Sequence, residues 1–153
     1  MGGLRARARP ALNPDTQTTV VIDTMVVSAL VNATRAPRLA GEYKLMIAGR
    51  RILISFATVT ELRYGALKAG WGDLRRRSLE RDLARFVIVQ PDDLLMSACA
   101  ELRAACEQLG HPLGQKHHEA DRWIAATAIR LGIPLVSRDG VFVGAPLLAL
   151  VHD

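Results

Sequence analysis

The sequence predicts an α/β fold with a parallel sheet and helices on both of its faces. Short apolar runs alternate along the chain with segments in which apolar residues recur at helical spacing. The runs at residues 20–22 and 52–54 are rich in Val, Ile and Leu, which is typical of strands buried on both faces of a parallel sheet. Strands that alternate with helices form βαβ units, so helices are expected above and below the sheet.

The first half of the chain is predicted to contain two strands and three helices. Their expected ranges are a strand at 18–22, helices at 24–32 and 37–48, a strand at 51–55 and a helix at 58–69. Gly49 ends the second of these helices. The apolar side of that helix is expected to consist of Leu39, Tyr43, Leu45 and Met46.

The second half repeats the alternation, beginning with a basic helix after the turn at residues 70–72. The expected ranges are a strand at 86–89, helices at 92–109 and 118–131, and strands at 134–137 and 147–151. The long helix carries one apolar stripe, formed by Leu95, Cys99, Leu102 and Cys106.

A single domain at residues 18–153 is predicted to follow a tail at residues 1–17. In the tail, Arg5, Arg7 and Arg9 alternate with alanine, and two prolines follow, so it is expected to be a disordered basic arm. A chain of 153 residues suits one domain with a substantial core.

Composition excludes several classes of protein. No stretch approaches the roughly 18 apolar residues of a membrane span, and no signal-peptide pattern is present, so a soluble cytoplasmic protein is expected. Cys99 and Cys106 lie seven residues apart on one predicted helix, about 10 Å at the helical rise, which is too far for a disulfide. The net charge of +5 favours a polyanionic partner, either nucleic acid or an acidic protein.

Four acidic residues fall at the edges of predicted strands and helices: Asp23, Glu61, Asp121 and Asp139. Each also has a local explanation. Asp23 could cap the next helix, Glu61 could form a capping box with Thr58, Asp121 could complement a helix dipole, and Asp139 could belong to a turn.

Taken together, the four acids predict a metal site. If strands one, two and four share a parallel sheet, then Asp23, Glu61 and Asp139 meet at the same edge, and a helix entering there adds Asp121. Like charges crowd together at low cost only when a cation neutralises them. Ligand sets made only of oxygen select hard divalent ions, Mg²⁺ or Mn²⁺, and such ions support phosphodiester cleavage.

Four segments carry a resemblance to a known family. They are VVIDT at residues 20–24, SFATVTEL at 55–62, DRWIAATA at 121–128 and LVSRD at 135–139. In this order they resemble PIN-domain ribonucleases, and most closely the VapC toxins of bacterial toxin–antitoxin pairs. The resemblance spans residues 20–151, and the segment at 121–128 is its most specific motif.

The resemblance implies a three-layer α/β/α fold with an acidic site that depends on Mg²⁺, with Mn²⁺ as a substitute. By matching motifs, Asp23, Glu61, Asp121 and Asp139 would be the catalytic, metal-binding acids. The hydroxyls of Thr24 and Ser137 would position the acids or water. Relatives often carry another acid soon after the last one, which this sequence lacks at Gly140, Val141, Val143 and Gly144. That departure puts a second metal site in doubt.

The expected activity is that of an endoribonuclease toxin. Water activated by the metal would attack phosphorus in single-stranded or structured RNA, leaving a 5′ phosphate and a 3′ hydroxyl. The resemblance also implies a cognate antitoxin and a homodimer. The apolar helices at 37–48 and 58–69 are candidate surfaces for either partner, although a core role is equally consistent.

Two other functions are compatible with the fold class. A phosphohydrolase of the haloacid dehalogenase type needs Asp-x-Asp after the first strand, and Met25 occupies the third position here. A PIN-like module that binds RNA without cutting it is disfavoured by the presence of all four acids.

Several further residues have two interpretations. His117 and His118 could share a helical face with Asp121, as metal ligands or as a base, or could be exposed side chains at a helix start. Glu119 points away from Asp121 and is left out of the site. The run at residues 75–77, three arginines, is either a solvated face or a grip on phosphates. Trp71 and Trp123 are expected to be packing residues.

Overall fold

The computed structural model describes residues 18–151. The predicted tail at residues 1–17 lies outside the described residues. The helices and strands, in chain order, are β1 (Thr19–Ile22), α2 (Thr24–Val31), α3 (Pro37–Ile47), β2 (Arg51–Ser55), α4 (Phe56–Lys68), α5 (Asp73–Leu83), β3 (Val87–Val89), α6 (Asp93–Leu109), η1 (Pro112–Gly114), η2 (Lys116–His118), α7 (Glu119–Leu131), β4 (Leu135–Val136) and η3 (Gly140–Phe142).

The strands form one parallel sheet in the order β3-β2-β1-β4. In its register, Ile22 lies opposite both Ile54 of β2 and Val136 of β4. The ends of β1, β2 and β4 are therefore aligned, so the residues that follow them emerge at the same edge. This confirms the predicted parallel sheet.

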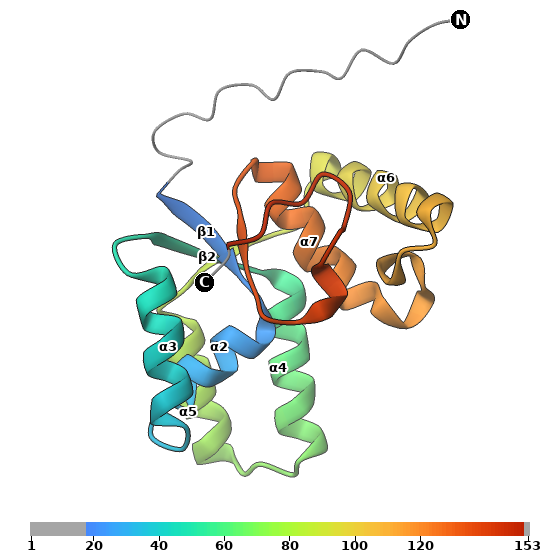
Figure 1. The fold of residues 1–153 in the computed structure, drawn as a ribbon. Helices are drawn as coiled ribbons and strands as arrows, with labels where there is room; N and C mark the ends of the chain where they lie inside the picture. Colours follow the sequence, from blue (N-terminus) through green and yellow to red (C-terminus); the bar gives the residue numbers. More distant parts are fainter. Residues whose placement is uncertain (1–17, 152–153) are drawn as a thin grey trace, which may run out of the picture.

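The central strand β1 is buried on both faces, as its β-branched sequence predicts. Val21 packs into a core with α6 and α7, while Val20 and Ile22 pack into a second core with α2, α3 and α5. All three side chains are fully buried. Helices therefore cover both faces of the sheet (Figure 1), and the three-layer α/β/α fold is confirmed.

Helix α6 forms as the sequence predicts. Asp92 caps its start by accepting a hydrogen bond from the Leu95 N–H at 2.7 Å. Gly110 ends the helix with φ of 68°, a left-handed conformation that favours glycine. The predicted stripe of Leu95, Cys99, Leu102 and Cys106 is buried against α7. Both cysteines are free thiols.

Helix α4 begins two residues earlier than predicted. Ser55 caps it by accepting a hydrogen bond from the Ala57 N–H at 3.1 Å, so the capping box of Thr58 and Glu61 was wrong. Thr58 is instead fully buried, and Glu61 lies in the second turn of the helix rather than the first. Ser55, and not Thr58, caps the helix because Ser55 is the last residue of β2, where the chain turns into the helix.

The predicted apolar side of α3 was partly wrong. Tyr43 is buried as expected, but Leu45 is 81% exposed and Leu39 is also exposed, while Ala40 and Ile47 face the core. A helix with many apolar residues allows more than one choice of inner face, and contact with α2 decides it.

The predicted fifth strand is reduced to one bridge, between Leu135 and Leu150. A turn joins Leu148 to Ala145, and Leu147 has φ of 66°, so the segment becomes extended only near Ala149. In residues 18–151, no helix combines the length and the apolar character needed to cross a membrane.

Candidate functional site

Asp23 is the first residue after β1 and is only 3% exposed. Its Oδ1 accepts a hydrogen bond from the Val26 N–H at 2.9 Å and so caps α2. Its Oδ2 accepts a hydrogen bond from the Ser137 hydroxyl. Asp23 therefore does cap α2, but only through Oδ1. Its Oδ2 is bonded to Ser137, the residue that follows β4.

Glu61 reaches the same edge from α4. Its Oε2 accepts a hydrogen bond from the hydroxyl of Thr24, the residue after Asp23. The Thr24 hydroxyl also lies 3.1 Å from the hydroxyl of the buried Thr58. Thr24 thus links Glu61 to the segment that carries Asp23. Sequence reasoning missed Thr58 because its spacing to Glu61 indicated a helix cap.

Asp121 lies in the first turn of α7 and is half-buried. Its Oδ2 is 3.0 Å from Nδ1 of His118. His117 is exposed and contacts the His118 ring, with centroids 4.1 Å apart. Of the two predicted histidines, only His118 touches a candidate acid.

Asp139 caps the short helix η3, since its Oδ1 accepts a hydrogen bond from the Val141 N–H at 3.0 Å. Its own N–H donates to the Ser137 hydroxyl at 3.0 Å. Because that hydroxyl also donates to Asp23, Ser137 joins two of the acids.

Electrostatic interactions connect all four acids. Burial raises the pKa of Asp23, and the negative charges of Asp139 and Asp121 raise it further, against the lowering effect of its hydrogen bonds from Ser137 and Val26. Burial also raises the pKa of Glu61; the Thr24 hydrogen bond lowers it, and the charges of Asp121 and Asp23 raise it. The structure therefore brings the four predicted carboxylates into one electrostatic cluster.

The donor chemistry of this cluster fits a hard divalent cation. Its candidate ligands are carboxylate oxygens, and the pKa values of Asp23 and Glu61 are raised by burial first and further by the charges of the neighbouring acids. Within residues 18–151, no three His, Cys, Asp or Glu side chains are arranged so that they could already hold a metal ion.

Arg122 is a structural residue of the site that sequence reasoning missed. It follows Asp121 in α7 and is 3% exposed, and its Nη1 donates to the carbonyls of Leu113 at 2.7 Å and Gln115 at 3.1 Å. The loop before α7 is thereby tied to the helix that carries Asp121. An arginine in a helix usually faces solvent, so nothing in the sequence distinguished this one.

The other conspicuous residues have mainly packing contacts. The Trp123 and Phe56 rings meet edge to face with centroids 5.2 Å apart, as expected of a packing residue. Trp71 packs against the core, and the Arg75 guanidinium stacks on its ring at 3.7 Å. Arg75 and Arg77 are exposed, which is consistent with either a solvated face or phosphate contacts.

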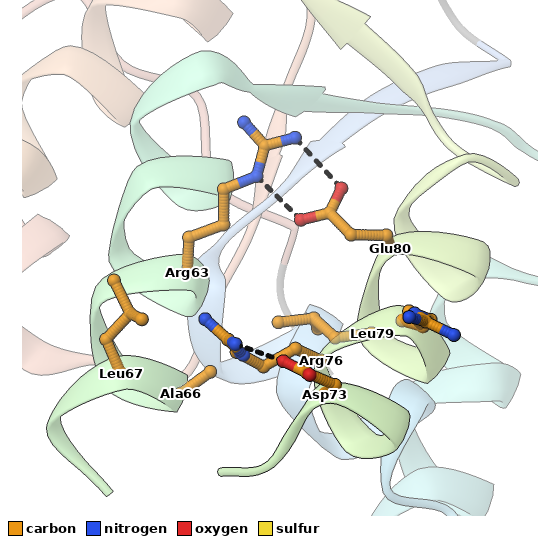
Figure 2. A pocket seen from close by; sticks show the side chains of 8 residues that line it. Arg63, Ala66, Leu67, Asp73, Arg76, Leu79 and Glu80 are labelled. Carbon is orange, nitrogen blue, oxygen red and sulfur yellow. Dashed lines mark hydrogen bonds and ion pairs between the residues drawn. The ribbon is translucent and has the colours of Figure 1, made fainter. Parts of the chain in front are cut away.

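A pocket of about 430 Å³ lies between α4 and α5, and none of the four acids lines it. Figure 2 shows two ion pairs among its lining residues, Arg63 with Glu80 and Arg76 with Asp73. Because none of its lining residues is one of the four acids, the pocket is distinct from the candidate site.

The chain is similar to a known protein family and to several solved structures. The family described as PIN domain matches residues 20–146. The crystal structure of VapBC2 from Rickettsia felis, bound to a DNA fragment from its promoter, shares 25% identity at a TM-score of 0.70, over 86% of this chain and 96% of that one. VapBC-5 from Mycobacterium tuberculosis shares 25% identity at 0.64, over 89% and 99%.

A third structure supports the fold alone. DNA-bound VapBC from Salmonella typhimurium shares 22% identity at a TM-score of 0.68, over 88% of this chain and 97% of that one. No curated protein sequence matches the chain significantly.

Proposed function

The chain belongs to the PIN-domain family of nucleases, and from this premise we propose that it is an Mg²⁺-dependent endoribonuclease, the toxin of a toxin–antitoxin pair. The observation that carries the proposal is the clustering of Asp23, Glu61, Asp121 and Asp139 at the carboxyl edge of the sheet, where α/β folds place their chemistry. These four acids would hold the ion, and Mn²⁺ would be its substitute.

The residues of the site prepare it for phosphodiester hydrolysis. When bound, the cation would supply water activation and charge neutralisation at phosphorus. Thr24 and Ser137 hold Glu61 and Asp23 through their hydroxyls, so the acids are oriented before substrate arrives. In the reaction, a water oxygen forms a bond to phosphorus and the bond to the 3′ oxygen breaks, which leaves a 5′ phosphate and a 3′ hydroxyl. One carboxylate accepts the proton that water loses, and the departing 3′ oxygen takes up a proton from solvent water.

The proposal favours one firmly held ion. Asp139 is followed by Gly140, Val141, Phe142, Val143 and Gly144, so no further acid joins the cluster from this segment. A second ion would depend on oxygens of the RNA phosphate for its remaining ligands.

An antitoxin partner is supported by the relatives. The similar structures from Rickettsia felis and Mycobacterium tuberculosis are described as VapBC, and the latter as a toxin–antitoxin system. Apolar side chains on α3 and α4 are available for an antitoxin or a second copy of the chain, since Leu45, Tyr64 and Leu67 are more than half exposed. Both assemblies are proposals for this chain.

Brief expression followed by sequencing of RNA ends tests the function in a cell. The wild type should create new 5′-phosphate ends within minutes, concentrated at particular sites. Asp23→Asn should create none, because a buried charge that neutralises the cation is lost. Equal patterns of ends from both proteins would refute the assignment.

A further inference from the structure

We propose that His118 is a positioning residue for the metal site, which orients Asp121 by donating a hydrogen bond from Nδ1 to its carboxylate. The inference rests on the proposed function, because it concerns a ligand of the proposed cation. Its physical basis is the separation of 3.0 Å between His118 Nδ1 and Asp121 Oδ2. An ionised carboxylate only accepts hydrogen bonds, so Nδ1 carries the hydrogen in this pair.

The contact leaves one oxygen of Asp121 for the site. Oδ2 is held by His118, whereas Oδ1 has no hydrogen-bond partner among residues 18–151. A partly exposed aspartate in the first turn of a helix can otherwise rotate between rotamers. The histidine therefore selects one rotamer and one free oxygen.

Two of the other three acids are held in the same way, whereas Asp23 has a hydrogen bond to each of its oxygens. Glu61 has Oε2 tied to Thr24, and Asp139 has Oδ1 tied to the Val141 N–H, each with its second oxygen left without a partner in the described part of the chain. Without His118, neither oxygen of Asp121 would be held by a hydrogen bond from residues 18–151. His118 thus fixes the orientation of Asp121 through a hydrogen bond to one oxygen, as Thr24 fixes that of Glu61.

His118 is itself held in place by a buried anchor. It ends the short helix η2, where its N–H donates to the Gln115 carbonyl at 3.2 Å. The same carbonyl accepts a hydrogen bond from the buried Arg122 at 3.1 Å. Since Arg122 and Asp121 are neighbours on α7, the loop that carries His118 is fixed to the helix that carries its partner.

Binding of Mn²⁺ alone, followed by electron paramagnetic resonance of the free ion, tests this role without any RNA. The loss of an outer hydrogen-bond partner of a metal ligand typically weakens affinity about 10–100-fold. We expect that loss for His118→Phe and for His118→Gln, whose amide reaches the position of Nε2. His118→Asn places its amide nitrogen near the position of Nδ1, so we expect its affinity to stay within about threefold of wild type, a smaller loss than the 10-fold lower end of that range.

His117→Phe is the matched control, because His117 contacts the His118 ring but makes no hydrogen bond to the four acids. Its Mn²⁺ affinity should equal that of wild type, and circular dichroism should show all variants folded. Three results would each overturn the inference. They are wild-type Mn²⁺ affinity in His118→Phe, an equal loss of affinity in His118→Asn and His118→Phe, and an equal loss of affinity in His117→Phe. A wild type that binds no Mn²⁺ would instead refute the metal site of the proposed function, and the positioning role with it.

Discussion

Asp23 combines two roles at the residue scale, and they have opposite effects on stability. As a cap it stabilises α2, but its buried charge opposes folding when no cation is present. A pKa raised in the folded state means that stability falls as pH rises through the acidic range, and the full penalty remains at neutral pH.

The first prediction follows from this penalty. In EDTA at pH 7, Asp23→Asn should unfold at a temperature no lower than that of wild type, because the amide removes the buried charge and its oxygen can still cap α2. Added Mg²⁺ should raise the unfolding temperature of wild type and not that of the variant, since only the native site binds the ion. Thermal unfolding by circular dichroism measures both. A Mg²⁺ effect of equal size in the two proteins would contradict the prediction.

At the scale of single elements, α7 depends on Arg122. The guanidinium satisfies the carbonyls of Leu113 and Gln115, and it is buried. Arg122→Leu should lower the free energy of unfolding by about 1–3 kcal/mol for each carbonyl that loses its partner without gaining water. Urea denaturation measures the change.

Arg130 provides the matched control on the same helix. Its nearest carboxylate oxygen, on Asp92, is 3.9 Å away, and both side chains are at least one-third exposed. Arg130→Leu should therefore cost less than about 1 kcal/mol. Equal losses for the two substitutions would show that burial of Arg122 is not what stabilises the loop.

A second link between elements joins α3 to the segment after β4. Glu42 accepts a hydrogen bond from Arg138 at 2.6 Å, and this bond lowers the pKa of Glu42 below its usual value. A lowered pKa stabilises the fold above the ordinary pKa of the side chain, and the contribution disappears as pH falls through the folded-state value.

Glu42→Gln should therefore be less stable than wild type at pH 7, and the difference should shrink as the pH drops below about 4.5, the ordinary range of a glutamate. Urea midpoints at several pH values measure this difference. A gap that does not change with pH would mean that lost packing, rather than charge, causes it.

The elements also show where sequence reasoning succeeded. Strand β1, helix α6 and the end of α7 form as predicted, because each has a clear signal in its own sequence. The signals are the apolar run of β1, which is buried on both faces, the cap at Asp92 and the glycine at residue 132. The start of α4 and the inner face of α3 differ from the prediction. Whether Ser55 or Thr58 caps α4, and whether Leu45 is exposed, depend on tertiary packing.

At the scale of the whole molecule, the four candidate acids could be named from sequence because the parallel topology brings strand ends together. Their supporting contacts could not be named in full. Arg122 acts through loop geometry around residues 113–115, and Thr58 acts through its burial, neither of which leaves a periodic pattern. The contact of His118 with Asp121, by contrast, follows the three-residue spacing that placed both on one helical face. Thr24 and Ser137 were foreseen only through the family resemblance.

The net charge of +5 leads to a prediction about RNA binding. If the exposed Arg75 and Arg77 contact phosphates, the double change Arg75→Gln and Arg77→Gln should reduce the slope of log affinity against log salt by about 0.7 for each contact. Filter binding in EDTA, where the RNA stays intact, measures the slope. An unchanged slope would assign these arginines to a solvated face.

The central claim is that the clustered acids make a metal-dependent ribonuclease, and cleavage of a labelled RNA by purified protein tests it most directly. Wild type should cut in Mg²⁺, stop in EDTA and recover when Mg²⁺ is restored, while folded Asp23→Asn should lose at least about 100-fold in rate, the scale of a lost electrostatic contribution to the transition state. Cutting by Asp23→Asn at the wild-type rate, or cutting by wild type that EDTA does not reduce, would contradict the account.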